Sequence, residues 1–277
     1  MKHQKTLTNF LPHLVILVTF LLLSTTWTIA QEVEDESEFD YIKGSEKGPS
    51  HWGELKKEWA TCKNGRLQSP IDLLSHRVKV VPKLGELKKY YKPHNATIKN
   101  RGHDIEVKWE GDAGSINING TQFFLHQAHW HSPSEHTING RRYDLEVHLV
   151  HESAKINGKS KIAVIGLLYE IGRPDPLLTK LSKYIIKGMV DTEAERSIGV
   201  IDPSEEIKLG GNKYYRYIGS LTVPPCTEDV IWTIYNKIRS VSREQVMLLR
   251  EAVYDHAEKN ARPIQLLNRR EIQLFDS

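Results

Sequence analysis

Six short runs rich in β-branched and aromatic residues, separated by turn residues, constrain the fold of this chain more than any other feature. They are typical of strands and cover residues 104–109, 115–119, 121–131, 142–152, 161–170 and 229–235. Asn-Gly pairs or single glycines separate several of them, as tight hairpins require. Two further segments, 175–188 and 242–257, carry apolar residues at helical spacing, and the second opens with a capping box from Ser242 to Gln245. The pattern predicts a single domain, mainly β with peripheral helices (α+β), built on a largely antiparallel sheet.

The first forty residues differ in character from the rest. Residues 1–30 combine a basic start, the apolar run Leu14–Leu23 and small residues ending at Ala30, which is the layout of a secretory signal peptide. The run is short for a bilayer span, so an uncleaved anchor is the less favoured alternative, and no stable membrane insertion is expected after cleavage. Residues 31–40 are acidic and almost free of apolar side chains, which predicts a flexible extension ahead of a folded domain at 41–277.

The net charge limits the classes of partner that the chain can bind, and the cysteine content bears on the compartment in which it works. A formal net charge of +3 over 277 residues gives no basic footprint for nucleic acid. Cys62 and Cys226 are the two cysteines of the sequence; they would be free thiols in a reducing compartment, but a chain that enters the secretory route favours one disulfide. Asn95 and Asn119 begin N-glycosylation sequons, which are meaningful only on that route.

Histidines cluster in two of the predicted strands. In the run 121–131, side chains alternate between faces, so His129 and His131 share one face. The strong turn signal Asn139-Gly140 returns the chain as 142–152, which carries His148. Two adjacent antiparallel strands can therefore direct three imidazoles to one point. Three neutral imidazoles with an open fourth position are typical of catalytic zinc, so we predict a Zn²⁺ site.

Polar neighbours on the same faces support this prediction. Gln127 and Glu146 each lie two residues from a ligand and could orient its second ring nitrogen. The alternative is that His129 and His131 form a pair facing solvent, and the third histidine with its polar neighbours favours the metal site. The remaining histidines of this region are interpreted as structural or surface residues: His126, His136 and His151.

Longer blocks carry a family resemblance. The chain resembles the α-class carbonic anhydrases, particularly the plant secretory forms, in "QAHWHSPSEHT", "LEVHLVH" and "YIGSLTVPPCTEDVIW", and in shorter blocks at 51–55, 68–73, 100–107, 163–172 and 260–265. The resemblance implies a twisted, largely antiparallel sheet of ten strands with zinc at its centre. It also implies reversible hydration of carbon dioxide to bicarbonate and a proton, by attack of zinc-bound hydroxide on CO2. The expected partners are these small molecules and water.

The same resemblance implies roles for individual residues. Thr222 matches the threonine that orients the hydroxide, and Glu135 matches the buried glutamate that accepts its hydrogen bond. His103 matches the histidine that exports the proton, since imidazole can both take up and release a proton near neutral pH. An apolar niche for CO2 and the adjoining substrate contacts are matched by Val150, Val164, Leu221, Thr222, Val223, Val230 and Trp232.

Two positions depart from the family pattern. Val223 follows Thr222 where many members carry a second threonine, so a substrate-side hydroxyl is lost. Glu54 in "HWGEL" is interpreted as standing where many relatives have a cavity tyrosine, which would alter the water chain that serves His103. Cys62 and Cys226 match the disulfide of the secreted forms.

Other classes of function stay open at this point. A storage or nectar protein of the same fold would lack the reaction, although such relatives often lose ligands that are intact here. A binding module would hold a structural zinc with its fourth position filled by protein, and esterase activity would be incidental. The final compartment is the extracellular space (apoplast) or the chloroplast stroma reached through the ER, and the sequence does not determine the oligomeric state.

Overall fold

The computed structural model describes residues 32, 38–188, 195–207, 209, 211–253 and 259–276. The predicted signal peptide at 1–30 lies outside this part of the chain. Among the described residues, none of the helices has the length and apolar character that a membrane span requires.

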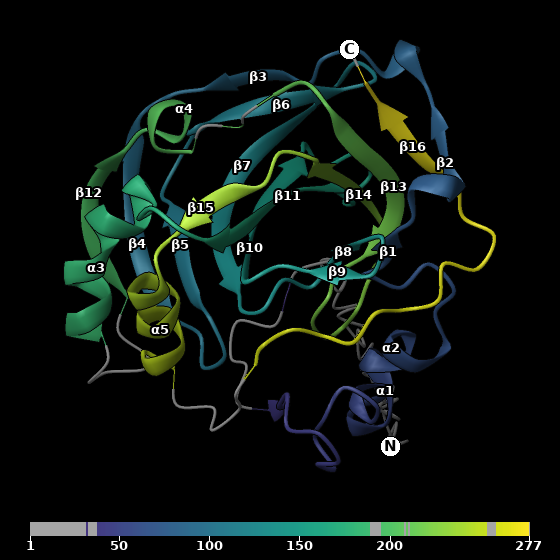
Figure 1. Ribbon diagram of the computed structural model, residues 1–277, viewed down its shortest axis with the longest axis horizontal. Helices are drawn as coiled ribbons and strands as arrows, with labels where there is room; N and C mark the ends of the chain where they lie inside the picture. The colour runs from purple at the N-terminus through teal and green to yellow at the C-terminus, as the bar shows by residue number, and fades with distance from the viewer. Residues whose placement is uncertain are drawn as a thin grey trace, which may run out of the picture.

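One large twisted sheet forms the body of the molecule (Figure 1). Of the thirteen strands that the described residues contribute to it, ten follow one continuous path. In spatial order they are β12 (Arg196–Ile201), β4 (His94–Asn100), β5 (Ile105–Trp109), β7 (Thr121–His131), β10 (Leu145–Ser153), β11 (Ile162–Ile171), β14 (Glu228–Tyr235), β13 (Tyr214–Ser220), β16 (Ile272–Phe275) and β2 (Val78–Val80). The prediction of one large twisted, mainly β sheet is confirmed, but the predicted count of ten strands is exceeded, since three further strands pair with the ten of the path.

The remaining strands are short and lie at the margins. β3 (Lys88–Tyr91) and β6 (Gly114–Ile118) extend from β7, and β15 (Arg239–Val241) pairs with β11. A separate small sheet contains β1 (Asp72–Leu73), β8 (Thr137–Ile138) and β9 (Arg141–Arg142). Pairing is mostly antiparallel, with parallel pairs at β11–β14, β11–β15 and β16–β2 in the large sheet and at β1–β8 in the small one.

The predicted turn at Asn139-Gly140 closes the β8–β9 hairpin. Both residues have positive φ, 51° and 76°, which is the conformation that favours Asn-Gly in a two-residue hairpin loop. The excursion between β7 and β10 is therefore a short hairpin of its own, which pairs through β8 with β1.

Helices cover the edges of the sheet. The two predicted helices are α3 (Pro176–Gly188) and α5 (Arg243–Glu251), and the expected capping box at Ser242 and Gln245 is present. Figure 1 shows α3 and α5 together beside β4 and β12. α3 buries Leu177, Leu178, Leu181 and Ile185, as its spacing predicted. The shorter helices are α1 (Trp52–Leu55), η2 (Lys57–Trp59), α2 (Thr61–Asn64), η3 (Ser75–Arg77), η4 (Pro82–Leu84) and α4 (Pro203–Glu206).

The folded body begins before the predicted boundary at Tyr41. Phe39 is buried, and its ring centroid lies 5.0 Å from that of Trp52 and 6.1 Å from that of Trp59. The prediction of a flexible extension through residue 40 is therefore wrong at its end, because burying one large aromatic ring outweighs the acidic residues around it.

The amino-terminal aromatic cluster is tied to the rest of the chain by the predicted disulfide. Cys62 and Cys226 form a bond of 2.05 Å and are buried with Phe39, Trp52 and Trp59. The bond joins α2 to the loop between β13 and β14 across 164 positions of sequence.

Candidate metal centre

The β7–β10 ladder brings the three predicted ligands together. His148 lies directly opposite His129 in the antiparallel register, and His131 lies two residues further along β7, on the same face. All three side chains are about 1% exposed. Each offers one ring nitrogen to a group whose members lie within 4.8 Å of one another. The strand alternation found in the sequence is therefore sufficient to converge the three rings.

Distances and unpaired atoms test whether this trio fits a metal. His148 Nδ1 lies 3.3 Å from His129 Nε2. Two imidazole nitrogens bound tetrahedrally at the usual zinc distance would be about 3.3 Å apart. His131 Nε2 is buried and has no hydrogen-bond partner among the described residues. A buried imidazole nitrogen without a partner is costly, and a metal ligand bond would satisfy it. The residues present therefore fit a zinc ion.

Each ligand ring is held by its second nitrogen. His129 Nδ1 donates to Gln127 Oε1 at 2.8 Å, and His148 Nε2 donates to Glu146 Oε1 at 2.8 Å. These contacts leave Nε2 of His129 and Nδ1 of His148 facing the centre.

His131 Nδ1 donates to the backbone carbonyl of Asn260 at 2.7 Å, a contact that the sequence reasoning missed. A main-chain acceptor leaves no signature in the side-chain pattern, although the block 260–265 had pointed to this segment.

Glu146 accepts further hydrogen bonds besides the one from His148. Its Oε1 also accepts from His136 Nδ1 at 2.7 Å, and its Oε2 accepts from the backbone N–H groups of Glu135 and His136. Gly166 on β11 leaves room for this carboxylate, because a Cβ there would lie 3.0 Å from Glu146 Oε1 and 2.6 Å from Ile234. His136 is thus a buried structural histidine, as the sequence suggested.

Burial and neighbouring charges set the protonation of these groups. Burial lowers the pKa of His129 well below its ordinary value, and the nearby Arg101 cation lowers it further. Burial also lowers the pKa of His148, against the opposing influence of the Glu146 carboxylate. Burial alone would raise the pKa of Glu146, but the histidines bonded to it outweigh that effect and hold its pKa well below the ordinary value. His129 and His148 are therefore neutral imidazoles at neutral pH, the form that binds metal.

A second buried carboxylate faces the same centre. Glu135 is fully buried, and its Oε1 accepts from the Arg262 backbone N–H at 2.8 Å. Its Oε2 has no hydrogen-bond partner among the described residues and lies 3.7 Å from His131 Nε2. Thr222 is 2% exposed on the loop between β13 and β14. An acceptor is thus available beside the ligands for a hydroxyl or water.

Comparison with known proteins shows to which family this chain belongs. A family model described as eukaryotic-type carbonic anhydrase matches residues 47–275. The chain belongs to the eukaryotic-type carbonic anhydrase family. Alpha carbonic anhydrase 7 of Arabidopsis thaliana is 51% identical over 267 residues, which cover 96% of this chain and 95% of that protein. The resemblance drawn from the sequence blocks is confirmed.

Solved structures of the family superpose closely. Dioscorin complexed with ascorbate gives a TM-score of 0.83 at 44% identity, covering 87% of this chain and 98% of that chain. The alpha-carbonic anhydrase of Thermovibrio ammonificans in complex with the inhibitor sulfanilamide gives 0.75 at 36% identity, covering 85% and 98%. The fold and the enzyme family are thereby established.

Most of the residues matched to the carbonic anhydrase substrate niche belong to one apolar cluster. Val164, Leu221, Val223, Val230 and Trp232 are buried, and Val150 is partly buried. The Trp232 ring centroid lies 4.8 Å from that of His148, so this cluster adjoins the ligands. Val223 belongs to the cluster around the disulfide and so contributes packing where many members of the family carry a hydroxyl.

His103, matched to the proton-exporting histidine of carbonic anhydrases, is buried under the amino-terminal segment. It is 5% exposed, and its Nε2 donates to the Phe39 carbonyl at 2.5 Å. The ring centroids of Phe39 and Tyr41 lie 5.0 and 5.3 Å away.

The interpretation of Glu54 as the counterpart of the cavity tyrosine is wrong. Glu54 is half exposed on α1, where it accepts from Lys63 at 2.5 Å and contacts His51 at 3.0 Å. Tyr41 is the tyrosine that lies against His103. The block "HWGEL" turns Trp52 inward and Glu54 outward on a one-turn helix, so Glu54 does not face His103.

The remaining candidate residues lie at the surface or in the core. Asn95 and Asn119 of the two sequons are exposed. His126 is half exposed beside Glu152 at 3.5 Å. His151 is buried, donating from Nδ1 to the Ala163 carbonyl and accepting from the Tyr91 hydroxyl.

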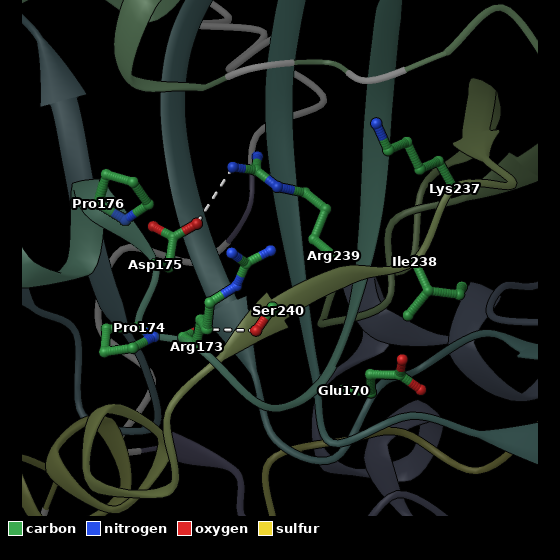
Figure 2. A pocket seen from close by; sticks show the side chains of 9 residues that line it. All are labelled: Glu170, Arg173, Pro174, Asp175, Pro176, Lys237, Ile238, Arg239 and Ser240. Atoms are coloured by element: carbon green, nitrogen blue, oxygen red, sulfur yellow. Dashed lines mark hydrogen bonds and ion pairs between the residues drawn. The ribbon is translucent and has the colours of Figure 1, made fainter.

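A separate hollow of about 550 Å³ lies away from the histidines, lined by residues of the β11–α3 loop and the start of β15 (Figure 2). Its carboxylates are already neutralised: Asp175 pairs with Arg239 at 3.1 Å, and Glu170 pairs with Arg141 at 2.9 Å. It contributes nothing to the metal centre.

Proposed function

We propose that this chain catalyses the zinc-dependent, reversible hydration of carbon dioxide to bicarbonate and a proton. The observation that carries the proposal is the convergence of three buried, individually oriented imidazoles, one of which has a nitrogen without a partner among the described residues. Zinc held by His129, His131 and His148 would lower the pKa of water to about 7, a value taken from carbonic anhydrases themselves. Three uncharged ligands leave the whole dipositive charge available for this effect.

The chain's own residues supply orientation, a niche and a proton exit. Thr222 would donate its hydroxyl hydrogen to the free Oε2 of Glu135 and thereby direct its lone pairs toward the reacting oxygen. The apolar side chains beside His148 would hold CO2, which offers no strong hydrogen-bonding groups, and exclude competing water. His103 would carry the proton away from the centre.

The test is stopped-flow hydration of CO2 by the mature chain, with and without a zinc chelator, beside the variant His148→Ala. Chelation and the variant should each lower the rate by at least about 1,000-fold, because the water pKa is no longer depressed. His126→Ala is the matched control, since this half-exposed histidine lies on the same strand as two ligands. Zinc binding by the wild type without hydration would contradict the enzymatic proposal and favour a storage or binding role, as in a relative that has lost activity.

We further propose that residues 1–30 are removed on entry to the secretory pathway, leaving an acidic start and a carbonic anhydrase domain. The disulfide and the exposure of Asn95 and Asn119 support this route, with both asparagines as glycosylation sites. The expected destination is the apoplast or the chloroplast stroma. Mass spectrometry of the secreted protein before and after glycosidase treatment tests the proposal.

A further inference from the structure

We infer that Glu32 is a positioning residue of the metal centre, acting on His129 through Gln127; the inference rests on the proposed zinc-dependent function. Its Oε2 accepts from Gln127 Nε2 at 2.9 Å and from Arg101 Nη1 at 2.8 Å. The same oxygen lies 3.8 Å from His129 Nδ1. A residue of the predicted extension therefore lies against the far side of a ligand ring.

The contact with Gln127 decides which way its amide points. A glutamine amide can turn either its oxygen or its nitrogen toward a neighbour. Glu32 offers only acceptors when ionised, so it binds the NH2 group and leaves Oε1 to accept from His129 Nδ1 at 2.8 Å. With Nδ1 donating, Nε2 of His129 is the nitrogen that faces the centre.

Arg101 fixes Glu32 in turn. The Arg101 side chain is 4% exposed and that of Glu32 is 8% exposed, so this is not a surface ion pair. Arg101 also pairs with Asp104 at 2.5 Å and lies 3.6 Å from Glu106. Because Arg101 keeps two other carboxylates, removing the charge of Glu32 does not leave the guanidinium without an anion.

The negative charge of Glu32 affects His129 through these hydrogen bonds. A carboxylate behind the amide polarises it, which strengthens the hydrogen bond from His129 and makes that imidazole a better donor to a cation. Outer partners of metal-binding histidines commonly change metal affinity by about 10- to 100-fold. Glu32 lies one hydrogen bond further out than Gln127, so its effect should fall at the lower end of that range.

The experiment measures zinc affinity by competition with dipicolinate in the full mature chain. Variants are Glu32→Ala, Glu32→Gln, Gln127→Ala and the double variant of Glu32→Ala with Gln127→Ala. Glu38→Ala is the control, because Glu38 is a half-exposed acid of the same segment that pairs with Lys56. Melting of the zinc-free proteins separates folding from metal binding.

Glu32→Ala should weaken zinc binding about tenfold, and Glu32→Gln, which keeps an acceptor without the charge, should weaken it less. Glu38→Ala should bind zinc as the wild type does. In the Gln127→Ala background, Glu32→Ala should add nothing, since its effect passes through that amide.

An unchanged affinity in Glu32→Gln and Glu32→Ala, or an equal loss with and without Gln127, would overturn the inference while the proposed function stands. A wild type that binds no zinc would reject both. Should Glu32→Ala fail to fold, the affinity of Glu32→Gln relative to the wild type decides the matter.

Discussion

The β7–β10 ladder, which carries the three clustered histidines, and the amino-terminal segment at 38–64, which packs against His103, are built in different ways. In the ladder, the register is continuous from Glu146 to Val150 and sets the direction of the side chains there, and His129 meets His148 as a direct cross-strand pair. The segment consists of one-turn helices held by the packing of Phe39 against Trp52 and by the disulfide. Its backbone has little regular structure of its own.

The difference shows how well the structure of each region can be predicted from the sequence. Alternation along a strand is a local rule, so two histidines at positions i and i+2 share a face wherever the strand lies. The place of Tyr41 or Glu54 depends on which aromatic residues of distant segments form a cluster. The three clustered histidines stand on the regular part, whereas Phe39 and Tyr41, which cover His103, stand on the irregular part.

The largest expected effect separates the two regions by stability. Replacing both Cys62 and Cys226 by Ala should lower the free energy of unfolding by about 5 kcal/mol, because the bond closes a loop of 164 positions in the chain-entropy model. Zinc should still bind, since the ladder is untouched. Thermal melting and metal analysis of the double variant check both halves, and loss of zinc would show that the ladder depends on the segment.

A smaller effect concerns the junction of the two regions. His103→Ala should slow CO2 hydration in weak buffer by roughly 100-fold, the lower end of what a proton-transfer group contributes. Added imidazole should restore part of the rate, and zinc content should stay that of the wild type. If the rate is unchanged, the burial of His103 beneath Phe39 means that it only packs.

The smallest effect tests the ladder beyond the ligands. Burial lowers the pKa of His151 to about 3. Between about pH 6.5 and that value the unfolded chain binds a proton that the folded chain refuses, so stability falls as the pH falls.

From pH 7 to pH 5 the loss attributable to His151 should be about 2 kcal/mol. Urea unfolding at both pH values should show a difference smaller by this amount in His151→Gln. His126→Gln, at a half-exposed position, should behave as the wild type. Parallel pH dependence in the wild type and His151→Gln would show that His151 is not the group responsible.

Much of the site could be predicted because its residues lie on strands. Gln127 and Glu146 were selected for sharing a face with a ligand, and both bond to the ligand ring concerned. The hydrogen-bond acceptor of His131 Nδ1 could not be predicted, since it is the backbone carbonyl of Asn260, which has no side-chain signature. Glu32 was assigned to a flexible extension because the acidic composition of that segment does not reveal that Glu32 pairs with the buried Arg101.

The sequence by itself determined the strand periodicity, the shared face of His129 and His131, the partner strand of His148 and the family. The first three follow from local geometry, in which each residue's direction depends on its immediate neighbours, and the family follows from the resemblance of the sequence blocks. Only the tertiary structure decided that Phe39 and Tyr41 cover His103, that Glu54 faces solvent and that Glu32 reaches Gln127. Such contacts join segments distant in sequence. They form because a buried charge is costly without a partner and an aromatic ring is stabilised by burial, and the groups that meet these needs come from other parts of the fold.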